Sequence, residues 1–153
     1  MADEQRRKAL WAVVLLCAAK KKWKRERTLW SKQMYLNREI RGSYYQTCME
    51  LYQGNNETHY DFFAYTRMPR WTFDDILAKI TPIISKKDTI MRDAIPPAAR
   101  LEATLRFLIT GIPYTQLQYY CRISNQSLSK IIPQVCEAIV TVLKDDYLKV
   151  GLI

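Results

Sequence analysis

Apolar side chains in the last third of the chain recur at helical spacing in three successive segments. Pro96 and Pro97 precede the first segment, where a missing backbone N–H costs little, and Gly111 follows it, as glycine commonly follows a helix. The second segment is "YTQLQYYC", and the three residues "RIS" separate it from the third. We therefore expect three helices joined by short turns. The side chains expected to face the core in the first two are Leu101, Leu105, Leu108, Ile109, Leu117, Tyr120 and Cys121.

Ser124 stands where the third helix would begin, and serine is a favoured N-cap because its hydroxyl accepts a hydrogen bond from a backbone N–H. Pro133 falls inside the helical pattern, where it removes one backbone hydrogen bond and crowds the preceding turn. The apolar period continues beyond Pro133, so we expect a kink near Ile132 and not a separate element. The expected apolar face consists of Leu128, Ile131, Ile132, Val135, Ile139 and Val142.

Small polar and basic side chains crowd the start of this third helix. One interpretation is an ordinary helical hairpin with a polar surface. The other is a helix-turn-helix unit at about residues 98–143 whose last helix binds DNA, because Asn and Gln can pair with adenine and Lys can reach guanine or phosphate. A capped helix N-terminus also favours phosphate. The candidate DNA-binding residues are Gln126, Ser127 and Lys130 toward the major groove, Arg122 and Asn125 nearer the DNA backbone, and the exposed Ser129.

The middle of the chain contains two helical patterns. A helix is expected over Ser43–Gln53, followed by the polar loop "GNNETHYD". The next helix, "TFDDILAKI", has Thr72 at its expected N-cap, and the connector "SKKDTIMRDAI" leads to Pro96. Seven aromatic side chains of this region are interpreted as core, with docking of a partner protein as the alternative: Tyr44, Tyr45, Tyr60, Phe62, Phe63, Tyr65 and Trp71.

The first 41 residues form a segment of different character, and we place a boundary at Gly42, giving domains over residues 1–41 and 42–150. Residues 4–41 contain neither Gly nor Pro, which predicts one long helix or two abutting ones. The apolar run "ALWAVVLLCAA" is too short for a membrane span, which needs roughly 20 residues. We expect it to pack against the domain or a partner; a membrane-surface anchor is the alternative.

The basic excess of the chain is concentrated at the N-terminus. The formal net charge is +9, and residues 1–41 carry twelve Lys and Arg against four Asp and Glu. This asymmetry indicates an anionic partner, either nucleic acid or a membrane surface. Lys21, Lys24 and Arg25 are the candidate phosphate contacts in this segment, with an ordinary solvated face as the alternative.

The spacing of the cysteines and histidine does not indicate a metal or cofactor site. The four cysteines form no CxxC pair, and His59 is the only histidine in the sequence, so ligands at zinc-site spacing are too few. We interpret the cysteines as reduced thiols, with Cys121 and Cys136 as small core residues. We expect neither a bound metal nor a cofactor.

The stretches "RMPRWTF", "DTIMRDAIPPAARLEATLRFLITG" and "ISNQSLSKIIPQVCEAIVTVL" together resemble the N-terminal part of PIF/Harbinger transposases and their domesticated descendants. The resemblance covers most of residues 29–147. It implies an all-α fold, here a helical domain with a C-terminal helix-turn-helix unit preceded by a long basic N-terminal helix. It also implies double-stranded DNA as a partner, a separate Myb-like protein partner, and a location in the nucleus and also the cytoplasm.

In that family an RNase H-like nuclease domain with three metal-binding acidic residues follows this region. The chain stops before such a domain would begin, and the adjacent Asp145 and Asp146 cannot converge as two-metal chemistry requires. We therefore expect a non-catalytic DNA-binding protein, either a domesticated or a truncated transposase. The alternatives are a helical protein-interaction module that partners a Myb-like protein, and a fragment of an intact metal-dependent nuclease.

Overall fold

The computed structural model describes residues 4–6, 10–11, 31–54, 58–90 and 92–147. The chain divides into two compact units, Met1–Ser31 and Lys32–Ile153. The described residues are mostly helical, and they contain no strand beyond one isolated antiparallel bridge between Thr89 and Arg92. The expected all-α class is therefore confirmed.

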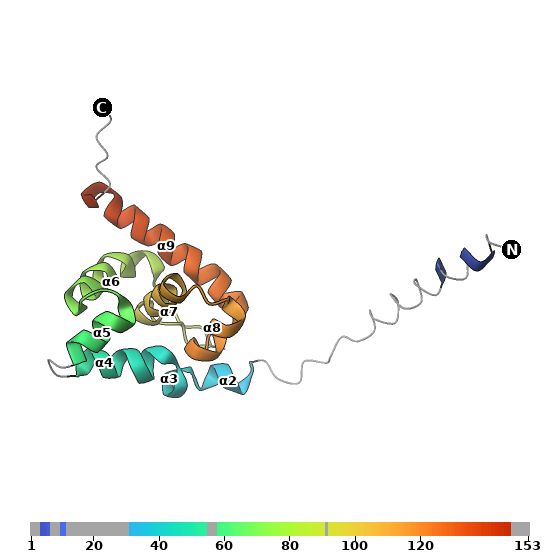
Figure 1. Cartoon of the computed structure of the whole chain (residues 1–153), viewed down its shortest axis with the longest axis horizontal. Coiled ribbons are helices and arrows are strands. Elements are labelled where there is room, and N and C mark those ends of the chain that lie inside the picture. The colour runs from blue at the N-terminus through green and yellow to red at the C-terminus, as the bar shows by residue number, and fades with distance from the viewer. Residues whose placement is uncertain (1–3, 7–9, 12–30, 55–57, 91, 148–153) are drawn as a thin grey trace, which may run out of the picture. The chain divides into compact units, whose positions relative to one another are not determined.

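Nine helical elements are described in the second unit (Figure 1). In chain order they are α2 (Gln33–Leu36), α3 (Arg38–Arg41), the π-helical turn η1 (Tyr44–Cys48), α4 (Met49–Gln53), α5 (Thr58–Thr66), α6 (Arg70–Ile84), α7 (Pro97–Thr110), α8 (Tyr114–Cys121) and α9 (Asn125–Tyr147).

Of the two arrangements expected before Gly42, one long helix or two abutting ones, the single helix is wrong for its described end. Lys32 has an extended backbone, and Asn37 separates α2 from α3, so residues 31–41 contain two short helices. The earlier part of the expected helix, including the apolar run and its basic flank, lies largely outside the described residues. The units divide at Ser31, ten residues before the boundary that charge and composition suggested.

The helix expected over 43–53 is present, although its first turn is π-helical. The polar loop after it is shorter than expected, because α5 begins at Thr58. Phe62 of α5 is completely buried and makes edge contacts with the rings of Tyr52 and Phe73. Burial of this aromatic side chain stabilises a helix that the surrounding polar composition does not predict.

Three of the seven aromatic side chains interpreted as core are exposed instead. Tyr60 and Phe63 of α5 and Trp71 of α6 retain 75%, 43% and 72% of their accessible surface. Phe62 occupies the inward position of α5, so Tyr60 and Phe63 are left on its outer side. Phe62 is buried, and Tyr44, Tyr45 and Tyr65 are half-buried.

The α6 helix begins at Arg70, two residues before the expected start, and continues to Ile84. Thr72 is therefore an interior residue and not the N-cap, which is Pro69. The apolar side chains of α6 at helical spacing face the core: Phe73 and Ile80 are buried, and Ile76 and Leu77 are half-buried.

The α7 helix lies at the centre of the unit and packs against α5, α6, α8, α9 and η1. Every residue from Ala99 to Leu105 is buried, including the charged Arg100 and Glu102. Gly111 follows the helix in the left-handed conformation, as expected, with φ of 63°. Leu108 was expected in the core but is 58% exposed, because Phe107 and Ile109 of the same turn pack against the core instead.

The α8 helix has the predicted extent and is joined to α9 by the predicted three residues, 122–124, while α9 continues to Tyr147, beyond residue 143 where the predicted unit ends. Leu117 and Cys121 of α8 are buried as expected, but Tyr120 is exposed because Cys121 takes the inward position beside it. Pro133 lies inside one continuous α9. The apolar face of α9 packs against α6 and α7, so its polar face is left toward solvent.

Candidate nucleic-acid interface

Ser124 caps the first turn of α9 with both its side chain and its backbone. Its Oγ accepts a hydrogen bond of 3.2 Å from the backbone N–H of Ser127. Its carbonyl oxygen accepts bonds from the N–H groups of Ser127 and Leu128, each 2.9 Å long. The N–H of Ser127, which would otherwise have no i−4 partner in the helix, is thus satisfied, and the predicted N-cap is confirmed.

The hydroxyls of Ser124 and Ser127 also lie 2.8 Å apart, so they share a hydrogen bond. Ser127 is half-buried, and its hydroxyl belongs to the cap. Among the predicted site residues, Ser127 is therefore placed to hold the start of α9 in shape as well as to line its outer surface.

The exposed side chains at the start of α9 are Asn125, Gln126, Ser129 and Lys130. The Ser129 hydroxyl donates a 3.0 Å bond to the backbone carbonyl of Gln126. Leu128 and Ile131 lie buried on the opposite side of the same turns. The core thereby fixes the rotation of α9 and leaves the amides of Asn125 and Gln126 and the ammonium of Lys130 exposed within its first two turns.

Arg122 adopts a left-handed conformation, with φ of 54° and ψ of 34°, at the end of α8. This conformation costs a non-glycine residue on the order of 1–3 kcal/mol and persists only where the surroundings impose it. Cys121 and Ile123 are both buried, so they fix the chain on either side of Arg122. The side chain is half-buried, and its Nε has no hydrogen-bond partner among the described residues.

The α8–α9 turn is supported from behind by a close backbone contact. A Cβ atom added to Gly42 would lie 2.5 Å from the carbonyl oxygen of Arg38 and 3.2 Å from that of Cys121. A glycine is therefore needed where the end of α3 meets the end of α8. The neighbouring Ser43 donates a 3.1 Å hydrogen bond to Oε2 of Glu102 on α7.

Glu102 is the centre of a buried polar cluster beneath this turn. It accepts hydrogen bonds from the hydroxyls of Ser43 and Tyr65, and the thiol of Cys121 lies 4.0 Å from Oε2. Burial raises the pKa of Glu102, while the two hydroxyl donors and the nearby Arg106 oppose that rise. The cluster bonds α7 to the start of η1, to α5 and to the end of α8. It therefore holds in place the helices that carry the α8–α9 turn.

Sequence reasoning did not identify Glu102. A signal was present, because Glu102 lies three and seven residues before Leu105 and Ile109 and therefore shares their helical face. A carboxylate on an apolar face indicates a buried hydrogen-bonded group.

The thiols of Cys48 and Cys121 are poor ligands and poor nucleophiles. Burial and then the charge of Glu102 raise the pKa of each to about 12. Thiol chemistry and metal binding both require the thiolate. Within the described part of the chain, no three His, Cys, Asp or Glu side chains are grouped so that they could hold a metal ion.

Three predicted phosphate contacts, Lys21, Lys24 and Arg25, lie outside the described residues. The residues that the fold does bring together are thus Arg122, Asn125, Gln126, Ser127, Ser129 and Lys130, all within the α8–α9 turn and the first two turns of α9.

No family model matches the chain, and neither the curated proteins nor the solved structures include one with significant similarity to it. None of the described helices is both long enough and apolar enough to cross a membrane.

Proposed function

We propose that the protein binds double-stranded DNA without cutting it, and that the start of α9 enters the major groove. The observation that carries this proposal is the exposed set Asn125, Gln126 and Lys130 at one capped helix end, directly after a three-residue turn. A helix whose N-terminal turns are exposed can present such side chains to base edges in the major groove. The α7, α8 and α9 helices would then act as a helix-turn-helix unit.

The chemistry of the exposed side chains suits base edges and phosphates. The amides of Asn125 and Gln126 can donate to and accept from adenine in a paired arrangement, and Lys130 can donate to guanine or to phosphate. Arg122, at the end of α8, is placed to reach a phosphate beside the groove. The basic residues Lys21, Lys24 and Arg25 would add sequence-independent attraction to the duplex, and a protein that binds DNA in this way would act in the nucleus.

This proposal agrees with the resemblance of the chain to the N-terminal region of Harbinger transposases. The expectation that the chain itself does not cleave DNA stays a prediction. Incubation of the purified protein with supercoiled plasmid and Mg²⁺ or Mn²⁺ checks it, and cleavage that co-purifies with the protein through several columns contradicts it.

A second candidate function is docking of a partner protein, such as a Myb-like one. The exposed aromatic rings of Tyr60, Phe63 and Trp71 favour it, because large exposed aromatic side chains are common in protein interfaces. If the protein shows no affinity for duplex DNA, this candidate moves ahead.

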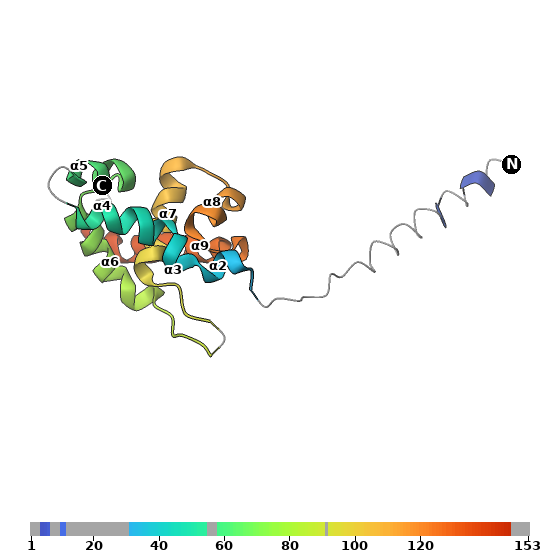
Figure 2. The same cartoon turned by 90° about the horizontal axis from the view of Figure 1, so that it is seen from below.

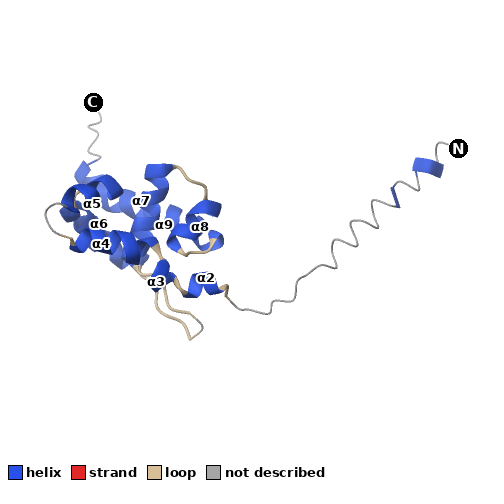
Figure 3. Ribbon diagram, turned by 60° about the horizontal axis from the view of Figure 1, so that its bottom comes forward, coloured by secondary structure: helices blue, strands red, loops and turns tan. Residues whose placement is uncertain are grey.

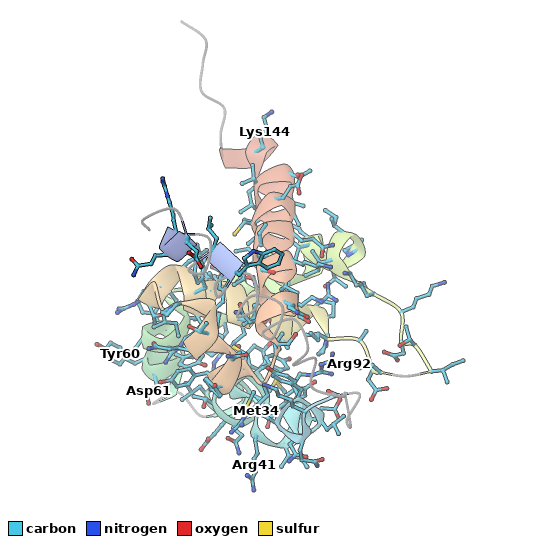
Figure 4. All side chains as sticks on the ribbon, turned by 90° about the vertical axis from the view of Figure 1, so that its right-hand side faces the viewer. Met34, Arg41, Tyr60, Asp61, Arg92 and Lys144 are labelled. Atoms are coloured by element: carbon cyan, nitrogen blue, oxygen red, sulfur yellow. The ribbon has the colours of Figure 1, made fainter. Side chains whose placement is uncertain are left out.

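Two lysines on α9 provide a matched test of the DNA proposal. Lys130 and Lys144 are both exposed and lie near opposite ends of the helix, with Lys144 at the remote end in Figure 4. Each would be changed to Ala, and duplex binding would be measured by fluorescence anisotropy at several salt concentrations. Lys130→Ala should weaken binding and reduce the salt slope by about 0.9, while Lys144→Ala should leave both unchanged. Equal effects of the two substitutions would contradict the proposed orientation of α9.

A further inference from the structure

The segment 85–95 between α6 and α7, termed the 85–95 hairpin, projects from the helices beside α3 (Figures 2 and 3). It is internally bonded. Thr89 and Arg92 exchange two backbone hydrogen bonds of 3.0 Å each, and the Thr89 hydroxyl also donates to the carbonyl of Arg92. Lower down, the Asp88 carboxylate accepts a 2.7 Å bond from the N–H of Ala94. These bonds hold the two arms of the hairpin together on either side of its tip.

A buried arginine fixes the base of the hairpin. Arg100 of α7 is only 3% exposed, and it donates from Nη1 to the carbonyl of Ile84 and from Nε to that of Ile95. Ile84 and Ile95 lie at the two ends of the hairpin, and both are buried. One rigid guanidinium therefore sets the spacing of the two arms. Arg38 adds a bond of 3.4 Å from Nη2 to the carbonyl of Ala94.

The tip of this anchored hairpin combines an aliphatic side chain with positive charge. Ile90 is fully exposed, at 105% of its reference surface, and Lys86, Lys87 and Arg92 on the two arms are exposed as well. Figure 4 shows Arg92 on the projecting segment. Of the two acidic residues in the hairpin, Asp88 accepts a hydrogen bond from the backbone of Ala94, and Asp93 is exposed beside Arg92. An aliphatic side chain between cations suits a partner that carries negative charge along two edges with stacked, uncharged groups between them.

The hairpin lies across a cavity from α2 and α3, and α2 is hydrogen-bonded to α8. A cavity of about 250 Å³ separates it from α2 and α3, with Tyr35 on one side and Thr89, Ile90 and Arg92 on the other. The hydroxyl of Tyr35 in turn donates a 2.9 Å hydrogen bond to Oε1 of Gln118 on α8. Tyr35 therefore lines the cavity that the hairpin faces and is also bonded to α8, the helix that precedes the candidate interface.

We propose that the 85–95 hairpin is a second DNA contact, in which Ile90 enters the minor groove while Lys86, Lys87 and Arg92 bind the flanking phosphates. Minor-groove proteins commonly insert an aliphatic wedge between base steps and bend the duplex, with basic side chains on the phosphates beside it. This inference rests on the proposed function, since it adds a second contact to the duplex held by α9. The contact would extend the bound DNA beyond the segment that α9 reaches.

The test uses the full chain and three sets of variants. Ile90→Ala is matched by Ile83→Ala, which shortens another exposed isoleucine on α6. A triple variant changes Lys86, Lys87 and Arg92 to Gln, and Lys130→Ala reports on α9 independently. Binding to a fluorescent duplex, hydroxyl-radical footprinting of the minor groove, and duplex bending by energy transfer between end labels are measured for each. Thermal melting verifies that each variant is folded.

The proposal expects Ile90→Ala to remove a patch of minor-groove protection and to reduce the bend, while Ile83→Ala changes neither. The triple variant should lower the slope of log affinity against log salt by roughly 2–3, at about 0.9 per phosphate contact. If Lys130→Ala weakens binding while the hairpin variants keep the parent footprint, bend and slope, the hairpin proposal is overturned and the proposed function stands. If the parent protein does not bind duplex DNA, both fail. Binding to phosphatidylserine-containing vesicles that Ile90→Ala abolishes, with DNA binding unchanged, overturns the assignment of the hairpin to DNA.

Discussion

The hydroxyl of Tyr65 donates a 2.6 Å hydrogen bond to Oε1 of Glu102, a carboxylate with 1% of its surface exposed. Ser43 donates to the other oxygen, so α5 and the residue before η1 both bind one side chain of α7. Burial raises the pKa of this carboxyl, whose ordinary value is 4.5, and the same carboxylate helps to raise the pKa of Cys121. The stability of the packing around Glu102, on which the α8–α9 turn rests, is therefore coupled to pH.

Replacement of Glu102 by Gln should change how stability depends on pH. A carboxyl whose pKa is raised on folding stabilises the folded state below its unfolded pKa, and that contribution is lost as pH rises through the raised value. From about pH 4.5 upward, the native protein should therefore lose free energy of unfolding relative to Glu102→Gln, by about 1.4 kcal/mol for each unit by which the pKa is raised. Urea unfolding of both proteins between pH 4 and 8 measures this difference. Parallel pH profiles would contradict a raised pKa of Glu102 in the folded protein.

Loss of the Tyr65 hydroxyl should leave Glu102 less satisfied. Tyr65→Phe keeps the aromatic ring, including its contact with Arg106 at 4.7 Å, but removes the donor to a buried carboxylate. Leaving such a group unsatisfied costs about 1–3 kcal/mol. Tyr60→Phe is the matched control, because Tyr60 is exposed and should change the free energy of unfolding far less. Equal effects in urea unfolding would argue against the Tyr65–Glu102 bond.

Removal of the Ser124 hydroxyl should destabilise α9 at its first turn. Ser124→Ala abolishes the bond to the N–H of Ser127 and the shared bond between the two hydroxyls, and loss of an N-cap costs about 1 kcal/mol. Ser129→Ala removes only an exposed bond to the carbonyl of Gln126 and serves as the control. Thermal or urea unfolding should show the larger loss for Ser124→Ala, and hydrogen exchange should show it first at Ser127 and Leu128. If Ser129→Ala lowered the free energy of unfolding as much as Ser124→Ala, the Ser124 cap would not be the source of the stabilisation.

The helices after Pro96 could be predicted from the sequence because strong local signals mark their ends. Proline precedes α7, Gly111 follows it in the left-handed conformation, and Ser124 caps α9. These signals act within one turn and need no knowledge of the tertiary packing. The exposed residues of α9 follow as well, since its apolar face is continuous and leaves one side outward.

Features that depend on distant partners could not be predicted. The α5 helix forms where Phe62 packs against Phe73, eleven residues later in the chain. The arrangement of the 85–95 hairpin depends on Arg100. Its side chain donates hydrogen bonds to two carbonyls that only the folded chain brings together. Glu102 and its donors likewise come from separate helices, although its position on an apolar face was a visible signal.

Deletion of residues 1–27 should make DNA binding less sensitive to salt. The deleted segment contains nine Lys and Arg against three Asp and Glu, and the second unit begins only at Lys32. Each phosphate contact that is lost lowers the slope of log affinity against log salt by about 0.9 on duplex DNA. Anisotropy titrations at several salt concentrations measure the slope for both proteins, and circular dichroism verifies that the helices remain. An unchanged slope would assign the basic segment to a different task.

Gln126 and Arg122 should differ in what they contribute to DNA binding. Gln126 is exposed on the first turn of α9, so Gln126→Ala should relax sequence preference at one base pair, at a cost of about 1–3 kcal/mol there. Arg122 lies at the end of α8, where a phosphate contact would weaken binding to all sequences about equally when lost. Arg122→Gln is the appropriate change, because it removes the charge while it keeps much of the length of this half-buried side chain at its left-handed position.

Selection of bound sites from a random duplex library, followed by sequencing, measures both effects. Gln126→Ala should flatten the preference at one position and leave the others, whereas Arg122→Gln should lower affinity and preserve the whole profile. Both proteins should keep their melting temperatures within a few degrees, since Gln126 touches no core and the Arg122 stem is largely retained. A profile altered by Arg122→Gln alone would mean that α9 is rotated or displaced from the groove. The turn residue would then be the one that reads the bases, because only a base contact changes sequence preference directly.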